Sequence, residues 1–383
     1  MIPITTIPVG RRDLERFLNG EAGSRERLAS TFKRMFCVDH VLFFNSGRTA
    51  LMTALQEAAK HGDRICLPAY TCPILFDVIL SSGMQPVPVD VEYETMSFGK
   101  ELAEAAKKEI TGVVAVHLFG DPISMQATRD AIARETFLIE DCAQSLGAFA
   151  DSSPVGTQGD YSIFSFGIGK TITAGIGGAL ASRGEVRSDV QGKSLRDTSS
   201  AFFNLFSMLV GSRPATYSIA YPILKALREK SDEGQAIRIS RKIPYRFAPN
   251  RLPEGCCRVL ITQLAALDEV IEQRRKHARM LTDLLSDNQL RFGLSRQALE
   301  QSSTFTRYVV RVPSSTRTPI MRALNKGGFE AEVPYPSLAR FLPSYGEFPT
   351  TKRLLVESLA LPVHGGMSEN DVQRMAMIIR RAR

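Results

Sequence analysis

The sequence has few cysteines, no long apolar run and no segment dominated by one charge. Its six cysteines among 383 residues show none of the C-x-x-C spacings of zinc sites, which argues against a metal site and a disulfide framework and for a reducing compartment. The first residues lack the basic-then-apolar layout of a signal peptide. No run approaches the roughly 18 uninterrupted apolar residues of a membrane span. The sequence therefore predicts a soluble, cytoplasmic protein.

The composition is that of an ordinary globular chain. Hydrophobic residues make up 44% and charged residues 23%, which excludes a disordered or collagen-like protein. Lys and Arg number 48 and Asp and Glu number 40, so the net charge is +8. Spread over this length, the excess is too dilute for a nucleic-acid-binding tail, although it suits small anionic partners. The length allows two or three domains and is typical of an enzyme.

Short β-rich runs alternate with helix-like stretches between about Val41 and Ser182. Strands separated by helices predict a mainly parallel sheet covered on both faces. In such sheets, ligands bind in the loops that follow the carboxyl ends of the strands. The predicted strands are Arg64–Tyr70, Gln85–Val91, Gly112–Gly120, Thr136–Cys142 and Tyr161–Phe166, and the predicted helices include Thr49–Lys60 and Met125–Arg134.

An apolar segment lies between Asp197 and Lys225, where Arg213 is the only charged residue. One interpretation is a helical hairpin buried in the fold or in a dimer contact, because apolar helices usually belong to a core. The other is an interfacial helix that touches a membrane surface through about residues 198–246. The second interpretation is supported by a basic cluster that comprises Arg238, Arg241, Lys242, Arg246 and Arg251.

The C-terminal third has a different pattern. A long helix is predicted from Cys256 to Leu285, where leucines recur at helical spacing. A smaller α+β part follows, with a strand at Thr306–Val312, a helix at Thr318–Gly327 and a final helix after Ser368. We therefore divide the chain into a large domain, residues 1–255, with an apolar insertion at about 198–245, and residues 256–383, which hold the linking helix and the small C-terminal domain.

The first motif with chemical meaning is Asn45–Leu51, where a strand-like run leads through a small-residue turn into a helical pattern. The unpaired N–H groups and positive dipole end of a helix N-terminus bind phosphate readily. A Ser-Gly turn is also common as a simple helix cap. On this motif alone, both interpretations stay open.

Two further motifs follow at strand ends. Glu140 and Asp141 end an apolar strand, where a carboxylate is costly to bury without a partner. One of them either caps a helix or stays ionised beside a cationic ring nitrogen or a metal. Lys170 follows another apolar strand in a glycine-rich loop. Most lysines are simply solvated, but desolvation lowers the pKa of an amine and makes it a nucleophile for a carbonyl.

Together, these three motifs meet the requirements of pyridoxal 5'-phosphate (PLP). Its phosphate needs an anchor, its ring nitrogen needs a carboxylate to stay protonated, and its aldehyde needs a lysine. The competing phosphate-binding motifs are missing, because no G-x-x-x-x-G-K-[ST] sequence occurs and the glycines of residues 167–178 lack the spacing of a dinucleotide fingerprint.

An ordered set of motifs over most of the chain resembles the DegT/DnrJ/StrS sugar aminotransferases, PLP enzymes of the aspartate-aminotransferase fold (fold type I). The matching stretches are SGRTAL (46–51), GDRICLPAYT (62–71), VHLFG (116–120), IEDCAQSLGA (139–148), VGTQGDYSIFSFGIGK (155–170), QLAALDEVIEQRR (263–275) and ESLALPVHGGMSENDV (357–372). The resemblance implies an α/β fold, with a mainly parallel central sheet in the large domain and a smaller C-terminal α+β domain. It also implies a homodimer whose active site lies at the subunit interface.

The resemblance assigns a catalytic role to Lys170, which would form the Schiff base with PLP and move the proton between substrate and cofactor. Asp141 would pair with the pyridinium nitrogen, and Gln144 would lie near the ring hydroxyl. Relatives that dehydrate sugars have a histidine at the position of Lys170. The lysine therefore favours transamination.

The resemblance also assigns the phosphate contacts and a crossing segment. Ser165 and the backbone N–H groups of Gly47 and Arg48 would hold the phosphate. Phe247–Arg251 resembles the segment that reaches into the partner subunit, and its candidate contacts there are Asn250 and Arg251.

Several departures from the family pattern concern the substrate side more than the cofactor. The ring-stacking aromatic residue of the family falls at Cys72, which leaves Tyr70 as the nearby substitute. The Asn-x-Arg of the crossing segment is one residue out of register. Three single replacements complete the set: Arg48 for a threonine, Ile176 for the glutamate of G-E-G-G, and Ala339 for a histidine.

We therefore predict a PLP-dependent aminotransferase that moves an amino group from an amino acid, expected to be glutamate, to a keto-sugar carried on a nucleotide, as in polysaccharide biosynthesis. No metal is expected. One alternative is another PLP enzyme of this fold that acts on a non-nucleotide or lipid-linked ketone. The other is a non-catalytic regulatory protein that binds PLP or a sugar only to sense it.

Overall fold

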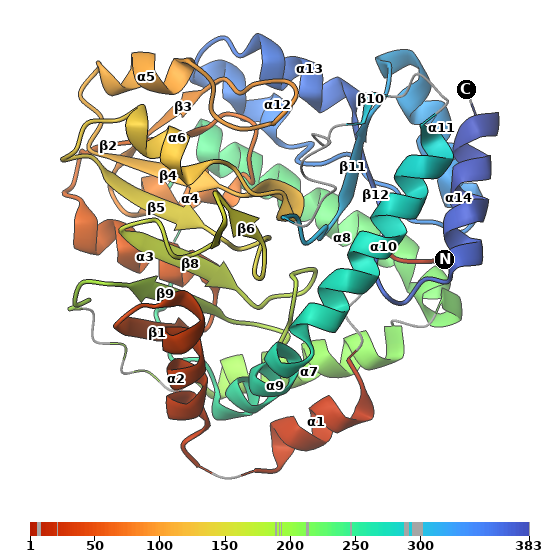
Figure 1. Ribbon diagram of the computed structural model, residues 1–383, viewed down its shortest axis with the longest axis horizontal. Coiled ribbons are helices and arrows are strands. Elements are labelled where there is room, and N and C mark those ends of the chain that lie inside the picture. Colours follow the sequence, from red (N-terminus) through yellow and green to blue (C-terminus); the bar gives the residue numbers. More distant parts are fainter. Residues whose placement is uncertain are drawn as a thin grey trace.

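The computed structural model describes residues 1–5, 9–20, 22–187, 190, 192, 194–211, 214–245, 247–286, 291–292 and 302–382. Its centre is a seven-stranded sheet in the order β1-β9-β8-β5-β4-β2-β3 (Figure 1). β9 runs antiparallel to both of its neighbours, and the other adjacent pairs are parallel. The strands are β1 His40–Phe44, β2 Arg64–Pro68, β3 Gln85–Val89, β4 Gly112–Val116, β5 Phe137–Asp141, β8 Tyr161–Ser165 and β9 Gly178–Ser182. The predicted mainly parallel sheet is confirmed, with slightly shorter strands.

Alternate side chains of these strands enter two hydrophobic cores, one on each face of the sheet. In β8, Phe164 packs with α2 and α9 on one face, whereas Ile163 packs with α3 and α4 on the other. This alternation follows from the period of two in a strand, and it explains the continuous apolar runs of the sequence. The helices of the large part are α1 Arg11–Leu18, α2 Ser24–Phe36, α3 Gly47–Ala58, α4 Ile74–Ser81, α5 Glu101–Ala106 and α6 Met125–Asp130.

A second, smaller sheet of three antiparallel strands forms the C-terminal part, at the right of Figure 1. It has its own core, to which Ile2 from the beginning of the chain also contributes. The final helix begins directly after Ser368, as predicted, because this serine and Asp371 form a capping box. The elements are β10 Arg291–Phe292, β11 Tyr308–Arg311, α11 Ser314–Lys326, α12 Leu338–Phe341, α13 Pro349–Glu357, β12 Ser358–Leu361 and α14 Glu369–Arg381.

The single long helix predicted for residues 256–285 is wrong, since the structure has two helices there. α9 (Glu254–Ala265) and α10 (Leu267–Leu285) are separated at Ala266, whose backbone is not helical. The two helices pack differently: α9 belongs to the core of the large sheet, and the end of α10 belongs to that of the small sheet. No glycine or proline marks the break, so the periodicity alone could not reveal it. The change of core falls within α10, between Ile271 and Ala278, and the division into domains after residue 255 stays a prediction.

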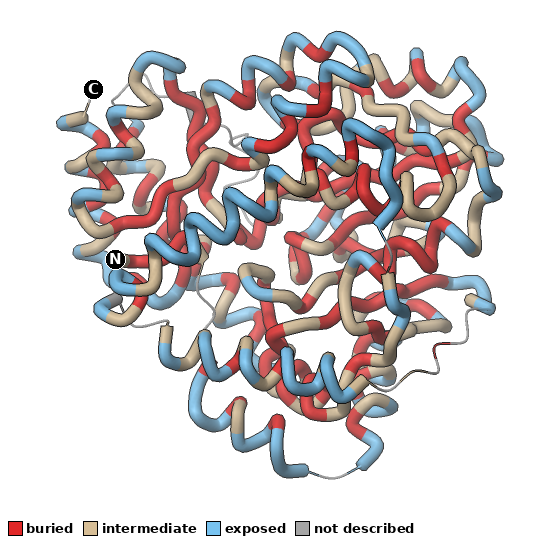
Figure 2. Tube along the Cα trace, turned by 180° about the vertical axis from the view of Figure 1, so that it is seen from behind, coloured by how far each residue is buried: buried red, intermediate tan, exposed pale blue. Residues whose placement is uncertain are grey.

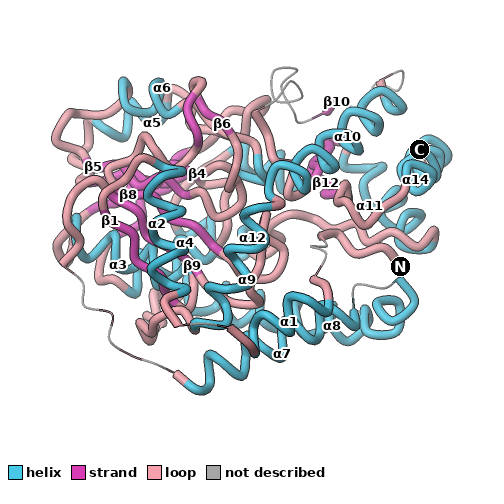
Figure 3. The backbone as a smooth tube through the Cα atoms, turned by 60° about the horizontal axis from the view of Figure 1, so that its bottom comes forward, coloured by secondary structure: helices cyan, strands magenta, loops and turns pink. Residues whose placement is uncertain are grey.

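The apolar segment forms a pair of helices, α7 (Leu195–Gly211) and α8 (Pro214–Ser240), which follow the lower edge of Figure 3 together with α1. Ala201 and Leu205 on the inner side of α7 are buried in the core, whereas apolar side chains on the outer side of α7 and along α8 are exposed. Tyr217 of α8 is buried as well, so the interpretation as a buried hairpin holds for the inner sides of the two helices, and burial in a dimer contact stays a prediction. None of the described helices combines the length and hydropathy needed to cross a membrane.

Candidate active site

A cavity of about 800 Å³ opens where the strands β4, β5 and β8 end, as expected for a parallel sheet. Val116, Asp141 and Ser165 are the last residues of these strands, and all three line the cavity. Of the predicted cofactor residues, the structure brings together Gly47, Arg48, Asp141, Gln144, Ser165 and Lys170 around this cavity. Residues that are far apart in the sequence therefore form one site.

The N-terminus of α3 forms one end of the cavity. Ser46 caps this helix, because its side chain accepts a hydrogen bond from the N–H of Thr49 at 3.2 Å. A Cβ on Gly47 would lie 3.0 Å from Cβ and 3.2 Å from Oγ of Ser165. Glycine at position 47 therefore keeps open a space between the helix N-terminus and a serine hydroxyl. Helix N–H groups, a hydroxyl and the exposed guanidinium of Arg48 fit a phosphate group there.

Asp141 is the acidic group of the cavity, and its side chain accepts a hydrogen bond from the N–H of Ala143 at 2.9 Å. Burial raises the pKa of this carboxyl group, and the hydrogen bond and the positive charge of Lys170 offset part of that rise. The residues that follow form turns rather than a helix, so Asp141 is not a helix cap. A buried carboxylate that lacks a strong partner is suited to a cationic ring nitrogen.

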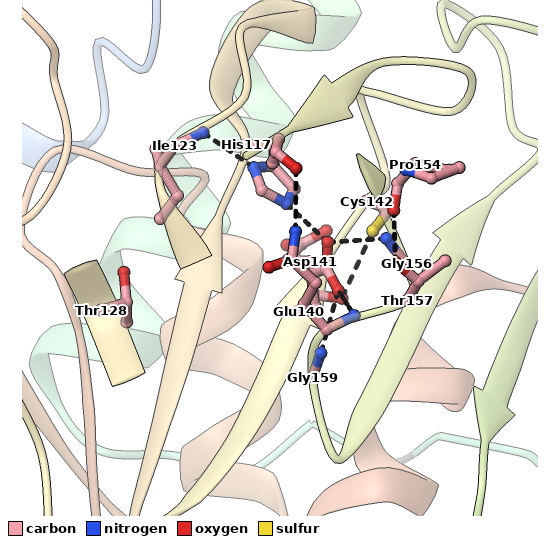
Figure 4. A network of polar contacts seen from close by, with 12 residues as sticks. His117, Ile123, Thr128, Glu140, Asp141, Cys142, Pro154, Gly156, Thr157 and Gly159 are labelled. Carbon is pink, nitrogen blue, oxygen red and sulfur yellow. Dashed lines mark hydrogen bonds and ion pairs between the residues drawn. The ribbon is translucent and has the colours of Figure 1, made fainter. Parts of the chain in front are cut away.

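Asp141 is held in place by a buried pair beside it, which Figure 4 shows. His117 Nδ1 accepts the N–H of Ile123 at 3.0 Å, so the proton is on Nε2 and is donated to Glu140 at 3.0 Å. The N–H groups of Gly156 (2.6 Å), Gln158 (3.1 Å) and Gly159 (3.1 Å) also point to the Glu140 carboxylate. Burial raises the pKa of Glu140, but these hydrogen bonds outweigh it, and the pKa is lowered.

His117, Glu140 and Cys142 also form the one group in the described parts of the chain whose side-chain atoms are spaced for a metal ion. Both ring nitrogens of His117 and both oxygens of Glu140 are already used in hydrogen bonds. Burial raises the pKa of the Cys142 thiol well above its usual value, and this thiol donates to the carbonyl oxygen of Glu140. The group is therefore a hydrogen-bond network within the protein.

Lys170 lies in the loop after β8 and lines the same cavity as Asp141. Burial lowers the pKa of its amine, the positive charges of Arg307 and Arg48 lower it further, and Cys72 and Asp141 act in the opposite direction. The loop is fixed to the body of the protein, because the N–H of Thr173 donates to the side chain of a buried glutamine at 2.8 Å. A lowered pKa increases the fraction of the amine that is unprotonated at a given pH, and the unprotonated form is the one that attacks a carbonyl carbon.

Gln144 connects the cavity to an aromatic wall. Its side-chain oxygen accepts the N–H of Phe119 at 3.2 Å, and its amide nitrogen donates to the hydroxyl of Tyr335 at 2.9 Å. The Tyr335 ring stacks on Phe119 with 5.5 Å between centroids and meets the Tyr70 ring edge-on at 5.7 Å. Tyr70 is fully buried and is not part of the cavity wall, whereas Cys72 is. The aromatic ring at this wall is therefore Tyr335 rather than the predicted Tyr70.

The sequence analysis missed several residues of the wall. Arg307 comes from the small part of the chain, where its Nε lies 2.9 Å from Glu332. No local signal marks it, because it precedes an ordinary strand. Arg196 and Asp197 come from the first turn of α7, at the border of the apolar segment. The cationic groups of the wall are Arg48, Lys170, Arg196 and Arg307, and its carboxylates are Asp141 and Asp197, so the cavity favours anions.

The predicted crossing segment is attached to its own chain. The side chain of Asn250 donates to Asp197 at 2.9 Å, and Arg251 donates to the carbonyl oxygen of Val190. Neither residue lines the cavity, although Phe247 and Ala248 of the same segment do. A contact of Asn250 or Arg251 with a partner subunit stays a prediction. Arg246 of the basic cluster lies outside the described residues. Ala339 is exposed and does not belong to the cavity wall.

Comparison with known proteins shows similarity over nearly the whole chain. The GDP-perosamine synthase of Vibrio cholerae is 32% identical over 167 residues, which is 43% of this chain and 46%, less than half, of that relative. The dTDP-3-amino-3,4,6-trideoxy-alpha-D-glucose transaminase of Micromonospora megalomicea subsp. nigra is 26% identical over 369 residues, 93% of this chain and 89% of the relative.

The fold is also that of solved aminotransferases. The structure of the aminotransferase TlmJ from Streptoalloteichus hindustanus has a TM-score of 0.75 at 21% identity and covers 100% of this chain and 98% of that one. This likeness confirms the predicted fold type I. The model of the DegT/DnrJ/EryC1/StrS aminotransferase family matches residues 15–201 and 227–380. The chain therefore belongs to the DegT/DnrJ/EryC1/StrS aminotransferase family and is an aminotransferase.

Proposed function

We propose that this aminotransferase uses PLP to move an amino group from glutamate to a keto-sugar linked to a nucleotide. The observation that carries the proposal is the shared cavity of Asp141, Lys170 and the N-terminus of α3. The names of the relatives from Vibrio cholerae and Micromonospora megalomicea, a GDP-sugar and a dTDP-sugar enzyme, support the substrate class. We further propose a cytoplasmic homodimer.

The residues of the cavity fit PLP in three places. Ser165 and the first N–H groups of α3 would hold the phosphate in the space that Gly47 leaves open. Asp141 would keep the ring nitrogen protonated, and Lys170 would hold the aldehyde carbon. When bound, PLP supplies an electron sink that stabilises the negative charge left on a carbon after proton removal.

The remaining work belongs to the side chains of this protein. Lys170, with its lowered pKa, would accept a proton from the donor carbon and return one to the acceptor. Asp141 is kept in position by the Ala143 N–H and by its neighbour Glu140, whose carboxylate accepts four hydrogen bonds. Gln144 and Tyr335 form one side of the cavity wall. The hydrogen bond between them fixes the position of this side, against which a bound ring would pack.

The substrates proposed here are anions. Arg196 and Arg307 are cationic groups of the wall that lie outside the proposed phosphate site. Guanidinium groups bind carboxylates and diphosphates in a bidentate manner. They therefore suit the carboxylates of glutamate in the first half-reaction and the diphosphate of a nucleotide sugar in the second.

The proposal is tested in two steps. Purified protein incubated with PLP should gain the visible absorption of PLP bound to a lysine, and Lys170→Ala should lack it. Glutamate should then bleach this absorption, and mass spectrometry with a panel of nucleotide-linked keto-sugars should detect an aminated product. If Lys170→Ala keeps the absorption unchanged, the assignment of the cofactor site is wrong.

Two other functions are distinguished by the same steps. A lipid-linked or non-nucleotide ketone is the second candidate acceptor, because the first turn of α7 lines the cavity while Phe203 and Phe206 on the same helix are exposed. This candidate predicts that glutamate bleaches the PLP absorption but that no nucleotide-linked sugar gives an aminated product. A sensing protein predicts PLP absorption that glutamate leaves unchanged.

A further inference from the structure

Part of the hairpin of α7 and α8 lies outside the match to the family model. The family model matches up to residue 201 and again from residue 227, so the end of α7 and the first half of α8 have no counterpart in it. These are also the residues with the highest apolar content of the segment. An insertion of exposed apolar helices calls for an explanation, because soluble proteins rarely expose contiguous apolar surface.

One side of α8 carries a line of exposed apolar residues. Ile219 is 80% exposed, and Ile223 (67%), Leu227 (60%) and Ile237 (54%) follow at helical spacing. Positions that are three, four or seven apart lie on the same side of a helix. Lys230 is exposed and falls on the same line. Figure 2 shows this helix crossing the rear of the molecule with an exposed outer side.

α7 contacts α8 and also carries exposed apolar residues on its outer side. Phe203 is 66% exposed, and Phe206 and Val210 are also exposed, whereas Ala201 and Leu205 on the inner side are fully buried. A helix that is apolar on all sides is normally covered on all sides. We call the apolar residues Phe203, Phe206, Val210, Ile219, Ile223 and Leu227 the outer hairpin surface.

The hairpin segment itself carries a positive net charge. Residues 195–245 contain eight Lys or Arg and four Asp or Glu. Two of the basic residues are paired with acids of the protein body: Arg228 with Glu330 at 2.8 Å and Arg238 with Asp77 at 2.9 Å. Three others, Lys230, Arg241 and Lys242, are exposed, and no ion pair to a described residue engages them.

The hairpin is also connected to the active site at both ends. Arg196 and Ser200 in the first turns of α7 line the cavity, as do Tyr245 and Phe247 after α8. The base of the hairpin therefore lies at the cavity, whereas the residues of the outer hairpin surface do not line it.

We propose that the outer hairpin surface binds the surface of a membrane rich in anionic phospholipids. Apolar side chains on one side of a helix enter the boundary between headgroups and acyl chains, and nearby Lys and Arg are attracted to anionic headgroups. A second copy of the chain centred on the same surface would instead bring two positively charged hairpins together, which is unfavourable. The contact is peripheral, since it uses helix sides. It is independent of which ketone the enzyme aminates.

Co-sedimentation of the full chain with vesicles tests the proposal. We expect binding to vesicles that contain about one-third phosphatidylserine in phosphatidylcholine, no binding to pure phosphatidylcholine, and weaker binding at high salt because surface electrostatics are screened. Absence of binding to the anionic vesicles overturns the proposal.

Variants test the contributions of the apolar and of the basic residues to vesicle binding separately. The triple variant Phe203→Ser/Ile223→Ser/Leu227→Ser and the double variant Lys230→Glu/Arg241→Glu should each reduce the partition coefficient by about tenfold or more. The controls are Val356→Ser/Met377→Ser and Lys107→Glu/Lys108→Glu, which change exposed residues of the same types on other elements. The controls should bind like the unchanged protein, and an equal loss in them would contradict a specific surface.

Sedimentation velocity and circular dichroism complete the test. Every variant should keep the helix content and the oligomeric mass of the unchanged protein, because the exposed residues contribute little to the core. If the triple serine variant forms a smaller assembly, the outer hairpin surface is a contact between copies of this chain, and the membrane proposal is wrong.

Discussion

His117 donates its Nε2 proton to Glu140 at 3.0 Å, at the end of the strand that also carries Asp141. The pair is fully buried, and the loop of residues 156–159 adds three N–H donors to the same carboxylate. A carboxylate with so many donors fixes the strand end and the loop after β7 (Ser153–Pro154) relative to each other. The acid that faces the cavity is thus positioned by the acid next to it, which faces the opposite side of the sheet.

Replacing Glu140 by Gln should destabilise the protein by about 2–4 kcal/mol at neutral pH, because buried N–H donors would face an amide group. The pKa of Glu140 is lowered in the folded state from its ordinary 4.5. The contribution of the ionised Glu140 carboxylate to the free energy of unfolding is therefore complete above about pH 4.5 and is lost as the pH falls below that value. Urea unfolding at pH 7 and pH 4 measures this. A penalty for Glu140→Gln that grows towards low pH would contradict the argument.

Gly47→Ala should weaken PLP binding by about tenfold or more, because the new Cβ would lie 3.0 Å from Cβ of Ser165, in the proposed phosphate space. Gly184→Ala is the matched control, since a Cβ there meets nothing within 4 Å. Fluorescence titration of the apoprotein with PLP measures the Kd. Equal affinities of the two variants would place the phosphate elsewhere.

Arg307→Gln should shift the pH dependence of the reaction of Lys170 with PLP to higher pH. Activity of the amine requires its unprotonated form, and the positive charge of Arg307 contributes to the lowered pKa of Lys170. Removing that charge raises the pKa, so a higher pH is needed for the same rate. Arg196→Gln is the control, because Arg196 lines the cavity but is not among the main causes of that pKa shift. Rates of PLP capture by the apoprotein between pH 6 and pH 10 measure the shift, and identical profiles would refute it.

Tyr335→Phe should lower the free energy of unfolding by about 1 kcal/mol, since the side-chain N–H of Gln144 loses its acceptor while the ring stays on Phe119. Tyr335→Ala should cost about 3–5 kcal/mol, because the stacked ring is lost as well. Urea unfolding of both variants is the measurement. Similar losses in the two would show that the ring contributes little to the wall.

Much of the cavity lining was predictable because the residues that we propose for the cofactor follow strand ends. Asp141 and Ser165 are the last residues of two apolar strands, and Lys170 lies five residues after the second. In a parallel sheet these ends meet at one edge, so the local sequence pattern was enough to group them. Arg307 could not be found in this way, since it reaches the cavity only after the small part of the chain has packed against the large one.

Tyr70 and the break at Ala266 show why other predictions failed. The sequence places Tyr70 near the site, but it does not show whether Tyr70 or Tyr335 lines the cavity. Packing between distant segments decides this, because the Tyr335 ring lies between Tyr70 and Phe119 and is the one that lines the cavity. Ala266 has no local signal for a helix end, and the first residues of α10, up to Ile271, still pack in the same core as α9.

The sequence alone determined most of the strand and helix pattern, the sheet type and the grouping of a helix N-terminus, an acid and a lysine, because these depend on spacing along the chain. Only the tertiary structure decided which aromatic ring and which arginines complete the wall. It also decided that one side of α7 is buried while the outer hairpin surface stays exposed. Both depend on the contacts between segments far apart in the chain, which no local pattern specifies.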